Sequence, residues 1–305
     1  MKQVLRDVFL FLSKNKALTT LAKRYGLNMG ASRFVAGETI NAAMDVIKLL
    51  NDQDLVVTLD YLGEFVDNEV EANLRAKKIC ETIEAIANAN LNSQVSLKLT
   101  SLGLDISEEI VLENLRMILL VAEHNNIFVT IDMEDFKRCQ KTLDIYKELR
   151  KEFNGLGTVI QAYLYRSERD VGELIHYQSN LRLVKGAYKE PPEVAFPNKS
   201  DVDINYKKLI KQHLLNGYFT AIATHDDAII EYTKRMVQAH KIPHDQFEFQ
   251  MLYGIRPEKQ LELVNEGYTM RVYVPFGADW YGYFMRRLAE RPANVAFVMK
   301  GMFRR

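Results

Sequence analysis

The sequence predicts an α/β protein built as a (β/α)8 barrel and preceded by a helical N-terminal extension. Eight short apolar or alternating runs are each followed by a longer segment with helical periodicity, and the pairs fill about 240 residues. Their connections are mostly short, which favours a closed barrel over an open doubly wound sheet. A length of 305 residues with 48% hydrophobic side chains is sufficient for one large core.

Each of the eight units pairs a predicted strand with the helix that follows it. The first four are residues 55–62 with 68–89, 95–100 with 108–124, 128–133 with 136–153, and 158–165 with 169–177. The second four are residues 181–188 with 203–215, 219–225 with 228–240, 247–253 with 257–266, and 270–275 with 280–289. Ser107 and Asp226 stand where helices are expected to begin, each followed by acidic residues that the helix dipole favours. We therefore divide the chain into a helical extension, 1–54, and a barrel domain, 55–305.

The composition excludes several classes of function. Forty Lys and Arg residues balance forty Asp and Glu residues, so the chain has no overall field for holding nucleic acid. Cys80 and Cys139 are too few for a disulfide framework and lack metal-ligand spacing, so we expect no metal site and a reducing compartment. No apolar run reaches the roughly 18 residues of a membrane span, which predicts a cytoplasmic protein. Gly155 and Gly157 lack the third glycine of a dinucleotide-binding loop, which argues against a Rossmann NAD site.

The N-terminal segment has a basic amphipathic pattern. Lysines and arginines at positions 2, 6, 14, 16, 23 and 24 interleave with apolar residues such as Val4, Phe9 and Leu12. An amphipathic helix that covers part of the core explains this pattern, and so does a transit peptide or a helix lying on a membrane surface. A helix that covers part of the core is the commonest explanation of such a pattern. The sequence leaves all three explanations open.

Polar residues embedded late in the apolar predicted strands indicate a candidate site. In a barrel of this type the chemistry lies at the carboxyl ends of the strands, where such side chains converge. Singly, each could instead face outward and pair with a charge on a helix, but together they would be costly to bury without a ligand. They are Lys98, Asp132, Gln161, Arg182, Lys185, His225, Glu248, Gln250, Arg271 and Tyr273.

Two adjacent arginines, Arg286 and Arg287, stand in the last predicted helix. Beside Glu290 they would ordinarily form a solvated charge cluster. The same helix carries several aromatic residues between Trp280 and Phe284, which predicts deeper burial than an outer barrel helix has. Two neighbouring guanidiniums could hold a substrate carboxylate if this helix lay across the barrel mouth.

Five segments of the sequence resemble the signature blocks of the proline dehydrogenase family. They are 181–188 (LRLVKGAY), 223–225 (ATH), 249–254 (FQMLYG), 271–275 (RVYVP) and 286–290 (RRLAE), within a resemblance that runs from about residue 55 to 294. The resemblance implies an FAD-dependent oxidoreductase on a distorted (β/α)8 barrel whose last helix lies above the barrel mouth. It implies oxidation of L-proline to Δ1-pyrroline-5-carboxylate by hydride transfer to FAD, the first step of proline catabolism to glutamate.

The resemblance also implies roles for individual residues. Asp132 and Arg182 are the positions that the family treats as catalytic. Substrate would be bound by Lys98, Tyr188, Leu252, Tyr273, Arg286 and Arg287, with Glu290 pairing with the cationic cluster. FAD would contact Met133, Gln161, Arg182, Lys185, Gly186, Ala187, Thr224 and His225.

Partners follow from the same resemblance. Reduced flavin would pass its electrons to a membrane quinone, which gives the amphipathic N-terminus a role in peripheral contact with the inner face of the membrane. We expect a separate pyrroline-5-carboxylate dehydrogenase to take the product, because the sequence leaves no room for a second catalytic domain after the barrel.

Other functions stay open on the sequence alone. Lys189 stands where the family usually has an aromatic residue after Tyr188, and the loop 277–279 is short, so hydroxyproline or an N-alkyl amino acid is an alternative substrate. Lys98 or Lys185 could form a Schiff base, as in an aldolase. A ligand-binding barrel without catalysis is a third alternative.

Overall fold

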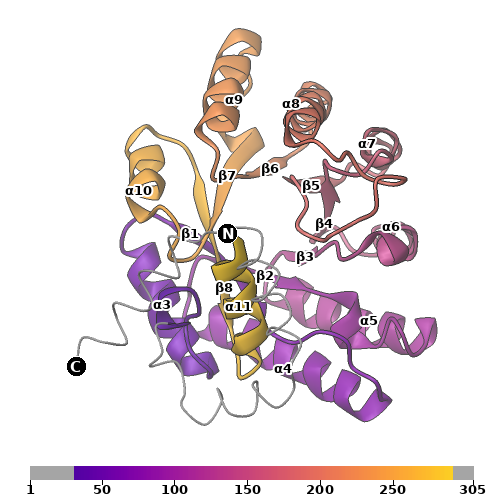
Figure 1. The fold of residues 1–305 in the computed structure, drawn as a ribbon. Coiled ribbons are helices and arrows are strands. Elements are labelled where there is room, and N and C mark those ends of the chain that lie inside the picture. The colour runs from indigo at the N-terminus through magenta and orange to yellow at the C-terminus, as the bar shows by residue number, and fades with distance from the viewer. Residues whose placement is uncertain (1–30, 291–305) are drawn as a thin grey trace.

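The computed structural model describes residues 31–290 and contains a closed barrel of eight parallel strands (Figure 1). The strands follow one another around the barrel in sequence order, and β8 closes the ring against β1. They are β1 (Val56–Tyr61), β2 (Ser93–Leu97), β3 (Val129–Ile131), β4 (Leu156–Gln161), β5 (Asn180–Val184), β6 (Thr220–Ala223), β7 (Phe247–Leu252) and β8 (Met270–Phe276). The predicted α/β barrel is confirmed.

Seven helices that follow β1 to β7 form most of the outer layer. They are α4 (Glu69–Asn88), α5 (Glu108–His124), α6 (Phe136–Leu149), α7 (Ser167–Ile175), α8 (Lys199–Leu215), α9 (Asp227–His240) and α10 (Pro257–Asn265). Short 3-10 turns lie at η2 (Ala31–Arg33), η3 (Leu99–Leu102) and η4 (His244–Gln246). Two further helices, α3 (Ile40–Asn51) and α11 (Trp280–Glu290), depart from the regular alternation.

The helix starts agree with the predicted capping residues. Ser107 accepts a hydrogen bond from the backbone N–H of Glu109, and Asp226 accepts one from the backbone N–H of Ala228. The observed strand ends agree less well with the predicted ones. The sequence pattern predicts a strand to residue 188, but β5 ends at Val184. Gly186 has a φ of +110°, which turns the backbone out of the extended conformation.

Helix α3 lies in the outer layer of the barrel although it precedes the first strand. Its buried residues Ala43 and Ile47 join the same apolar core as Leu55, Val57 and Leu59. Figure 1 places α3 between α10 and α4, the position that the helix after β8 would fill in a regular barrel. The predicted division at residue 54 therefore falls within a shared core.

Helix α11 packs over the barrel mouth, as the sequence predicts for the last helix. Its residues Trp280, Tyr281, Tyr283, Phe284 and Leu288 form a second apolar cluster with Phe34, Val35, Leu62 and Ile255. Leu62 and Ile255 lie just beyond the carboxyl ends of β1 and β7, so the cluster covers the end of the barrel where the loops that follow the strands converge.

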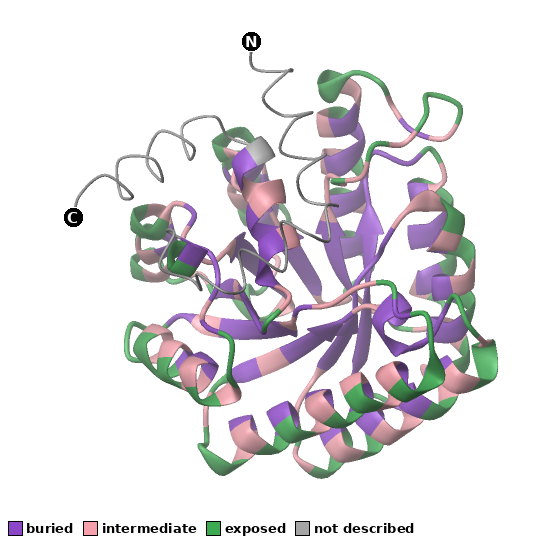
Figure 2. Cartoon of the chain, turned by 60° about the horizontal axis from the view of Figure 1, so that its bottom comes forward, coloured by how far each residue is buried: buried purple, intermediate pink, exposed green. Residues whose placement is uncertain are grey.

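Burial follows the layers of the barrel (Figure 2). Buried residues run along the strands and the inward faces of the helices, while exposed residues lie on the outer helix faces. Within residues 31–290 no helix is both long and apolar enough to span a membrane. The basic amphipathic segment at positions 2–24 lies outside the described residues.

Candidate functional site

Asp132, which directly follows the carboxyl end of β3, is the centre of an ion-pair cluster formed with Lys98, which directly follows β2, and with side chains of β5 and β8. Its Oδ1 accepts a hydrogen bond from Nη1 of Arg182 at 2.7 Å. Its Oδ2 accepts from Nζ of Lys98 at 3.1 Å and from the hydroxyl of Tyr273 at 2.6 Å. Nζ of Lys98 also donates to Oδ2 of Asp60 at 3.1 Å. The fold thus brings together four of the predicted site residues from four different strands.

The cluster holds a carboxylate and an ammonium in their ionised forms. Burial opposes the charge of Asp132, but Lys98 and Arg182 outweigh it and hold the pKa of Asp132 below its ordinary value. Burial also opposes the charge of Lys98, whose pKa is nevertheless raised well above its ordinary value by Asp60, Tyr273 and Asp132. The pKa of Asp60 is raised, because burial outweighs its attraction to Lys98.

Arg182 is the most enclosed cation of the cluster, with 6% of its surface exposed. Besides its contact with Asp132, its Nη2 donates to Oγ of Ser96 at 2.8 Å. Its guanidinium carbon lies 5.2 Å from the centroid of the Tyr273 ring. These contacts come from three directions and fix the plane of the guanidinium.

A second link joins the loops that carry Lys98 and Asp132. Oε1 of Glu134 accepts a hydrogen bond from the backbone N–H of Thr100 at 3.0 Å, and Oε2 accepts one from the Thr100 hydroxyl at 2.6 Å. Glu134 is 1% exposed, and burial raises its pKa to about 7 despite these hydrogen bonds. The turn after β2 and the loop after β3 are therefore held together by this link as well as by the ion pair of Lys98 and Asp132.

Sequence reasoning missed Asp60 and Glu134. Asp60 interrupts an apolar run late in the first strand, which is the same signal that identified Lys98 and Asp132. Glu134 lies outside any strand, two residues after Asp132, and only the fold shows that it reaches Thr100.

The side chains predicted to bind substrate approach the cluster from the barrel mouth. Leu252 ends β7 and packs against the aromatic cluster of α11. Tyr188 lies in the loop after β5, where burial and then Glu64 raise the pKa of its hydroxyl, while Lys98 and Arg286 act in the opposite direction. Tyr188 is therefore within electrostatic reach of Lys98 and Arg286, two of the cations predicted to bind substrate.

The two arginines of α11 make different contacts. Nη2 of Arg286 donates to Oε1 of Glu64 at 3.1 Å, and 36% of the Arg286 side chain is exposed. The guanidinium of Arg287 lies over the ring of Tyr283, 4.9 Å from its centroid. Glu290 ends the helix, but its side chain lies outside the described residues, so its pairing stays a prediction.

The residues predicted to contact FAD follow β3 to β6. Nε2 of Gln161 donates to the backbone carbonyl oxygens of Met133 and Glu134 at 3.5 and 3.1 Å. Its Oε1 is buried and has no hydrogen-bond partner within the described part of the chain. At Gly186 a Cβ atom would overlap the ring of Tyr163, and the next residue, Ala187, is exposed. Gln161 thus offers a buried acceptor beside a loop that requires glycine.

Lys185, Thr224 and His225 tie the loops after β5 and β6 to their neighbours. Nζ of Lys185 forms ion pairs with Asp203 and with Oδ2 of Asp226, the latter at 2.8 Å. Oγ1 of Thr224 accepts from the backbone N–H of Asp226 at 3.1 Å. Nε2 of His225 accepts a hydrogen bond from the backbone N–H of Leu252 at 3.0 Å. The His225 ring is therefore fixed at the end of β7.

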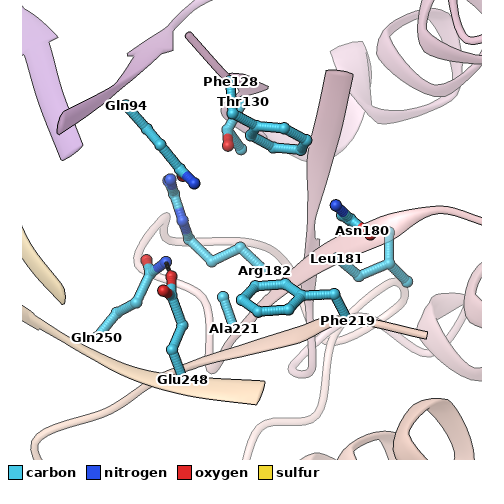
Figure 3. Close-up of a pocket in the computed structure, with 10 residues that line it drawn as sticks. All are labelled: Gln94, Phe128, Thr130, Asn180, Leu181, Arg182, Phe219, Ala221, Glu248 and Gln250. Carbon is cyan, nitrogen blue, oxygen red and sulfur yellow. Dashed lines mark hydrogen bonds between the residues drawn. The ribbon is translucent and has the colours of Figure 1, made fainter. Parts of the chain in front are cut away.

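Three of the polar strand residues lie elsewhere. Glu248, Gln250 and Arg271 form a network in the lower half of the barrel interior, with Arg271 Nε donating to Glu248 at 2.7 Å and Gln250 Nε2 donating to it at 2.6 Å. Figure 3 shows Glu248 and Gln250 facing a cavity below Arg182. Among the described residues, no three His, Cys, Asp or Glu side chains are grouped in a way that could hold a metal ion.

Comparison with known proteins identifies close relatives along the whole chain. Residues 43–300 match the family model described as "Proline dehydrogenase". The chain is 58% identical to "Proline dehydrogenase 1" of Bacillus subtilis (strain 168), over 99% of this chain and 100% of the relative, and 44% identical to "Proline dehydrogenase" of Deinococcus radiodurans, over 99% of each. A crystal structure of proline utilization A from Bdellovibrio bacteriovorus, inactivated by N-propargylglycine, superposes with a TM-score of 0.83 at 28% identity, over 99% of this chain and 38% of that longer one.

Proposed function

Because this chain belongs to the proline dehydrogenase family, we propose that it is an FAD-dependent enzyme that oxidises L-proline to Δ1-pyrroline-5-carboxylate. The observation that carries the proposal is the cluster in which Lys98, Arg182 and Tyr273 converge on Asp132 beneath α11. It lies at the end of the barrel where barrel enzymes react, and it provides cations for a carboxylate.

We assign the proline carboxylate to Lys98, Arg286 and Arg287. Arg286 donates one N–H to Glu64, which leaves further donors of its guanidinium for a carboxylate. In a site closed by Tyr188, these cations favour the anionic carboxylate and disfavour a second positive charge on the ring nitrogen. The unprotonated amine keeps the lone pair that stabilises the iminium product as the neighbouring carbon loses its hydride.

The loops after β3 to β6 fit a large cofactor that is anionic and rich in hydrogen-bonding groups. The buried Oε1 of Gln161 can accept from a ring N–H, and the glycine backbone at Gly186 permits a turn that no other residue would fit. When bound, FAD would supply the hydride acceptor. The residues that we propose hold it are Met133, Gln161, Arg182, Lys185, Gly186, Ala187, Thr224 and His225.

Within this site Arg182 and Asp132 act on charge and position. Arg182 supplies a fixed positive charge next to the reacting groups, and Asp132 keeps Arg182 and Lys98 in place through its two oxygens. Asp132 stays a carboxylate in this scheme, because Lys98 and Arg182 outweigh its burial and hold its pKa below the ordinary value.

Anaerobic addition of L-proline to the flavin-loaded protein tests the proposed function. We expect the visible flavin absorbance to bleach, and parallel additions of hydroxyproline and of an N-alkyl amino acid identify the preferred substrate. A bound flavin that stays oxidised in excess proline would contradict the proposal.

The charge of the lysines argues against a Schiff-base aldolase. A nucleophilic lysine needs a lowered pKa, whereas the pKa of Lys98 is raised by Asp60 and its neighbours. Lys185 is engaged by the carboxylates of Asp203 and Asp226. Borohydride trapping of a carbonyl substrate on either lysine would restore the aldolase alternative.

We further propose a membrane quinone as electron acceptor and a separate dehydrogenase as consumer of the product. The protein would be cytoplasmic and would contact the inner face of the membrane through its basic amphipathic N-terminal residues. Co-sedimentation with anionic liposomes, with and without residues 1–30, tests this contact. Equal binding of the two proteins would contradict it.

A further inference from the structure

The lower half of the barrel contains a polar cavity that the proposed reaction does not use (Figure 3). Its volume is about 130 Å³. The residues that line it precede the site residues on the same strands, since Thr130 lies two positions before Asp132 and Gln94 four positions before Lys98. The cavity is therefore on the amino-terminal side of the ion-pair cluster, and Arg182 lines it from above.

The cavity reaches the amino-terminal end of the barrel. Phe128, Asn180 and Phe219 line it there and are half-buried, whereas Thr130 and Arg182 deeper inside are buried. Solvent can therefore enter from the end of the barrel opposite to α11.

Two buried polar atoms beside this cavity lack partners in residues 31–290. They are Nε of Arg182, a donor, and Oε1 of Gln250, an acceptor, in side chains that are 6% and 4% exposed. Glu248 orients the amide of Gln250, because its Oε1 accepts a hydrogen bond from Nε2 of Gln250 at 2.6 Å. The amide oxygen Oε1 of Gln250 then has no hydrogen-bond donor within the described residues. Figure 3 shows both side chains directed into the same space. Leaving such buried atoms without a hydrogen-bond partner would destabilise the fold.

The charges around the cavity are already balanced. Glu248 is paired with Arg271 at 2.7 Å, and Arg182 is paired with Asp132 at 2.7 Å. A net anion or cation would meet no uncompensated opposite charge, so a neutral molecule that both donates and accepts hydrogen bonds fits best. Water does both, and each molecule occupies about 30 Å³.

We propose that this cavity is a water site whose bound molecules hydrogen-bond Nε of Arg182 and Oε1 of Gln250. The guanidinium of Arg182 is then held by Asp132 and Ser96 at its two terminal nitrogens and by water at Nε. Gln250 and the water are positioning elements for Arg182, and this consequence rests on the proposed function.

A high-resolution crystal structure of the flavin-loaded protein tests the water site directly. We expect ordered water within about 3.2 Å of both atoms. A cavity in which neither atom contacts water would overturn the proposal. This result does not depend on which substrate the enzyme oxidises, so it is distinguishable from a failure of the proposed function.

The Ala221→Val variant tests the positioning role. Ala221 lines the cavity, and the larger valine side chain would occupy space that water fills. We expect loss of ordered water and a roughly tenfold slower limiting rate of flavin reduction, with the half-saturating proline concentration changed less than about twofold. Ala43→Val places the same substitution at a fully buried position of α3, away from the cavity, and should leave the rate unchanged. Gln250→Met removes the acceptor at similar volume and is expected to give the same result should Ala221→Val fold poorly. Variants that lose the water and keep the wild-type rate would overturn the positioning role.

Discussion

The carboxylate of Asp132 accepts hydrogen bonds from Lys98, which directly follows β2, from Arg182 of β5 and from Tyr273 of β8. Each of its oxygens faces a different cation. The side chain therefore fixes the separation of Lys98 and Arg182 and also balances their charge. Such an arrangement is stable only as a unit, because removal of one partner leaves another charge buried without compensation. The chemistry of the site therefore depends on positions that four separate strands supply.

Replacing either arginine of α11 by methionine should weaken proline binding. Arg286→Met and Arg287→Met each remove a charged hydrogen bond to the carboxylate worth about 1.5–3 kcal/mol, which corresponds to a roughly 10- to 150-fold higher KM. Steady-state kinetics with proline measure the effect, and the flavin spectrum should show undiminished cofactor. Arg116→Met, which removes an exposed guanidinium on α5, is the matched control. Wild-type KM in both α11 variants would refute the assignment.

Glu134 predicts a pH dependence of stability. Its pKa rises from an ordinary 4.5 to about 7 in the folded protein, so folding favours the protonated acid. The contribution of Glu134 to the free energy of unfolding is fully present below about pH 4.5 and is lost as the pH rises through 7. This loss lowers the free energy of unfolding by about 3 kcal/mol. Glu134→Gln cannot ionise, and its stability relative to wild type should therefore increase between pH 4.5 and 8. Urea unfolding at several pH values measures this, and parallel pH profiles for the two proteins would contradict it.

At the scale of elements, α3 fills the place in the outer layer that α11 leaves open. Ile47 of α3 is fully buried in the barrel core, whereas Leu49 on the same helix is 62% exposed. Ile47→Ala should lower the free energy of unfolding by about 2–5 kcal/mol, and Leu49→Ala by less than about 0.5 kcal/mol. Chemical denaturation of both variants measures the difference. Similar values for the two would mean that α3 contributes little to the barrel.

Element boundaries show which signals are local. The starts of α5 and α9 follow from Ser107 and Asp226, because a capping side chain bonds backbone groups two residues away. The end of β5 depends on a positive φ at Gly186, which the apolar run around it does not reveal. The same polar pattern in strands also marks residues outside the site, because Gln250 faces the lower cavity and Arg271 donates to Glu248 and to the backbone carbonyl of Val57.

At the scale of the whole molecule, the apolar core of the barrel is separate from the apolar cluster beneath α11. Trp280, the only tryptophan of the sequence, lies in the cluster between α11 and the barrel mouth, apart from the barrel core. We expect α11 to open before the barrel unfolds, since a small separate cluster has a lower local stability than the main core. In a urea titration, tryptophan fluorescence should change at a lower concentration than far-UV circular dichroism. Coincident transitions would indicate one cooperative unit.

The sequence by itself determined the barrel class, the order of its strands and helices, and the residue types that meet at the site. It could do so because hydrophobic periodicity, capping and the direction of parallel strands are properties of local segments. Only the tertiary structure decided that α3 replaces α11 in the outer layer, that Asp60 joins the ion-pair cluster and Glu134 bonds Thr100 beside it, and which polar strand residues face the lower cavity. These depend on contacts between residues far apart in the chain, and a pattern within one segment carries no information about its partner.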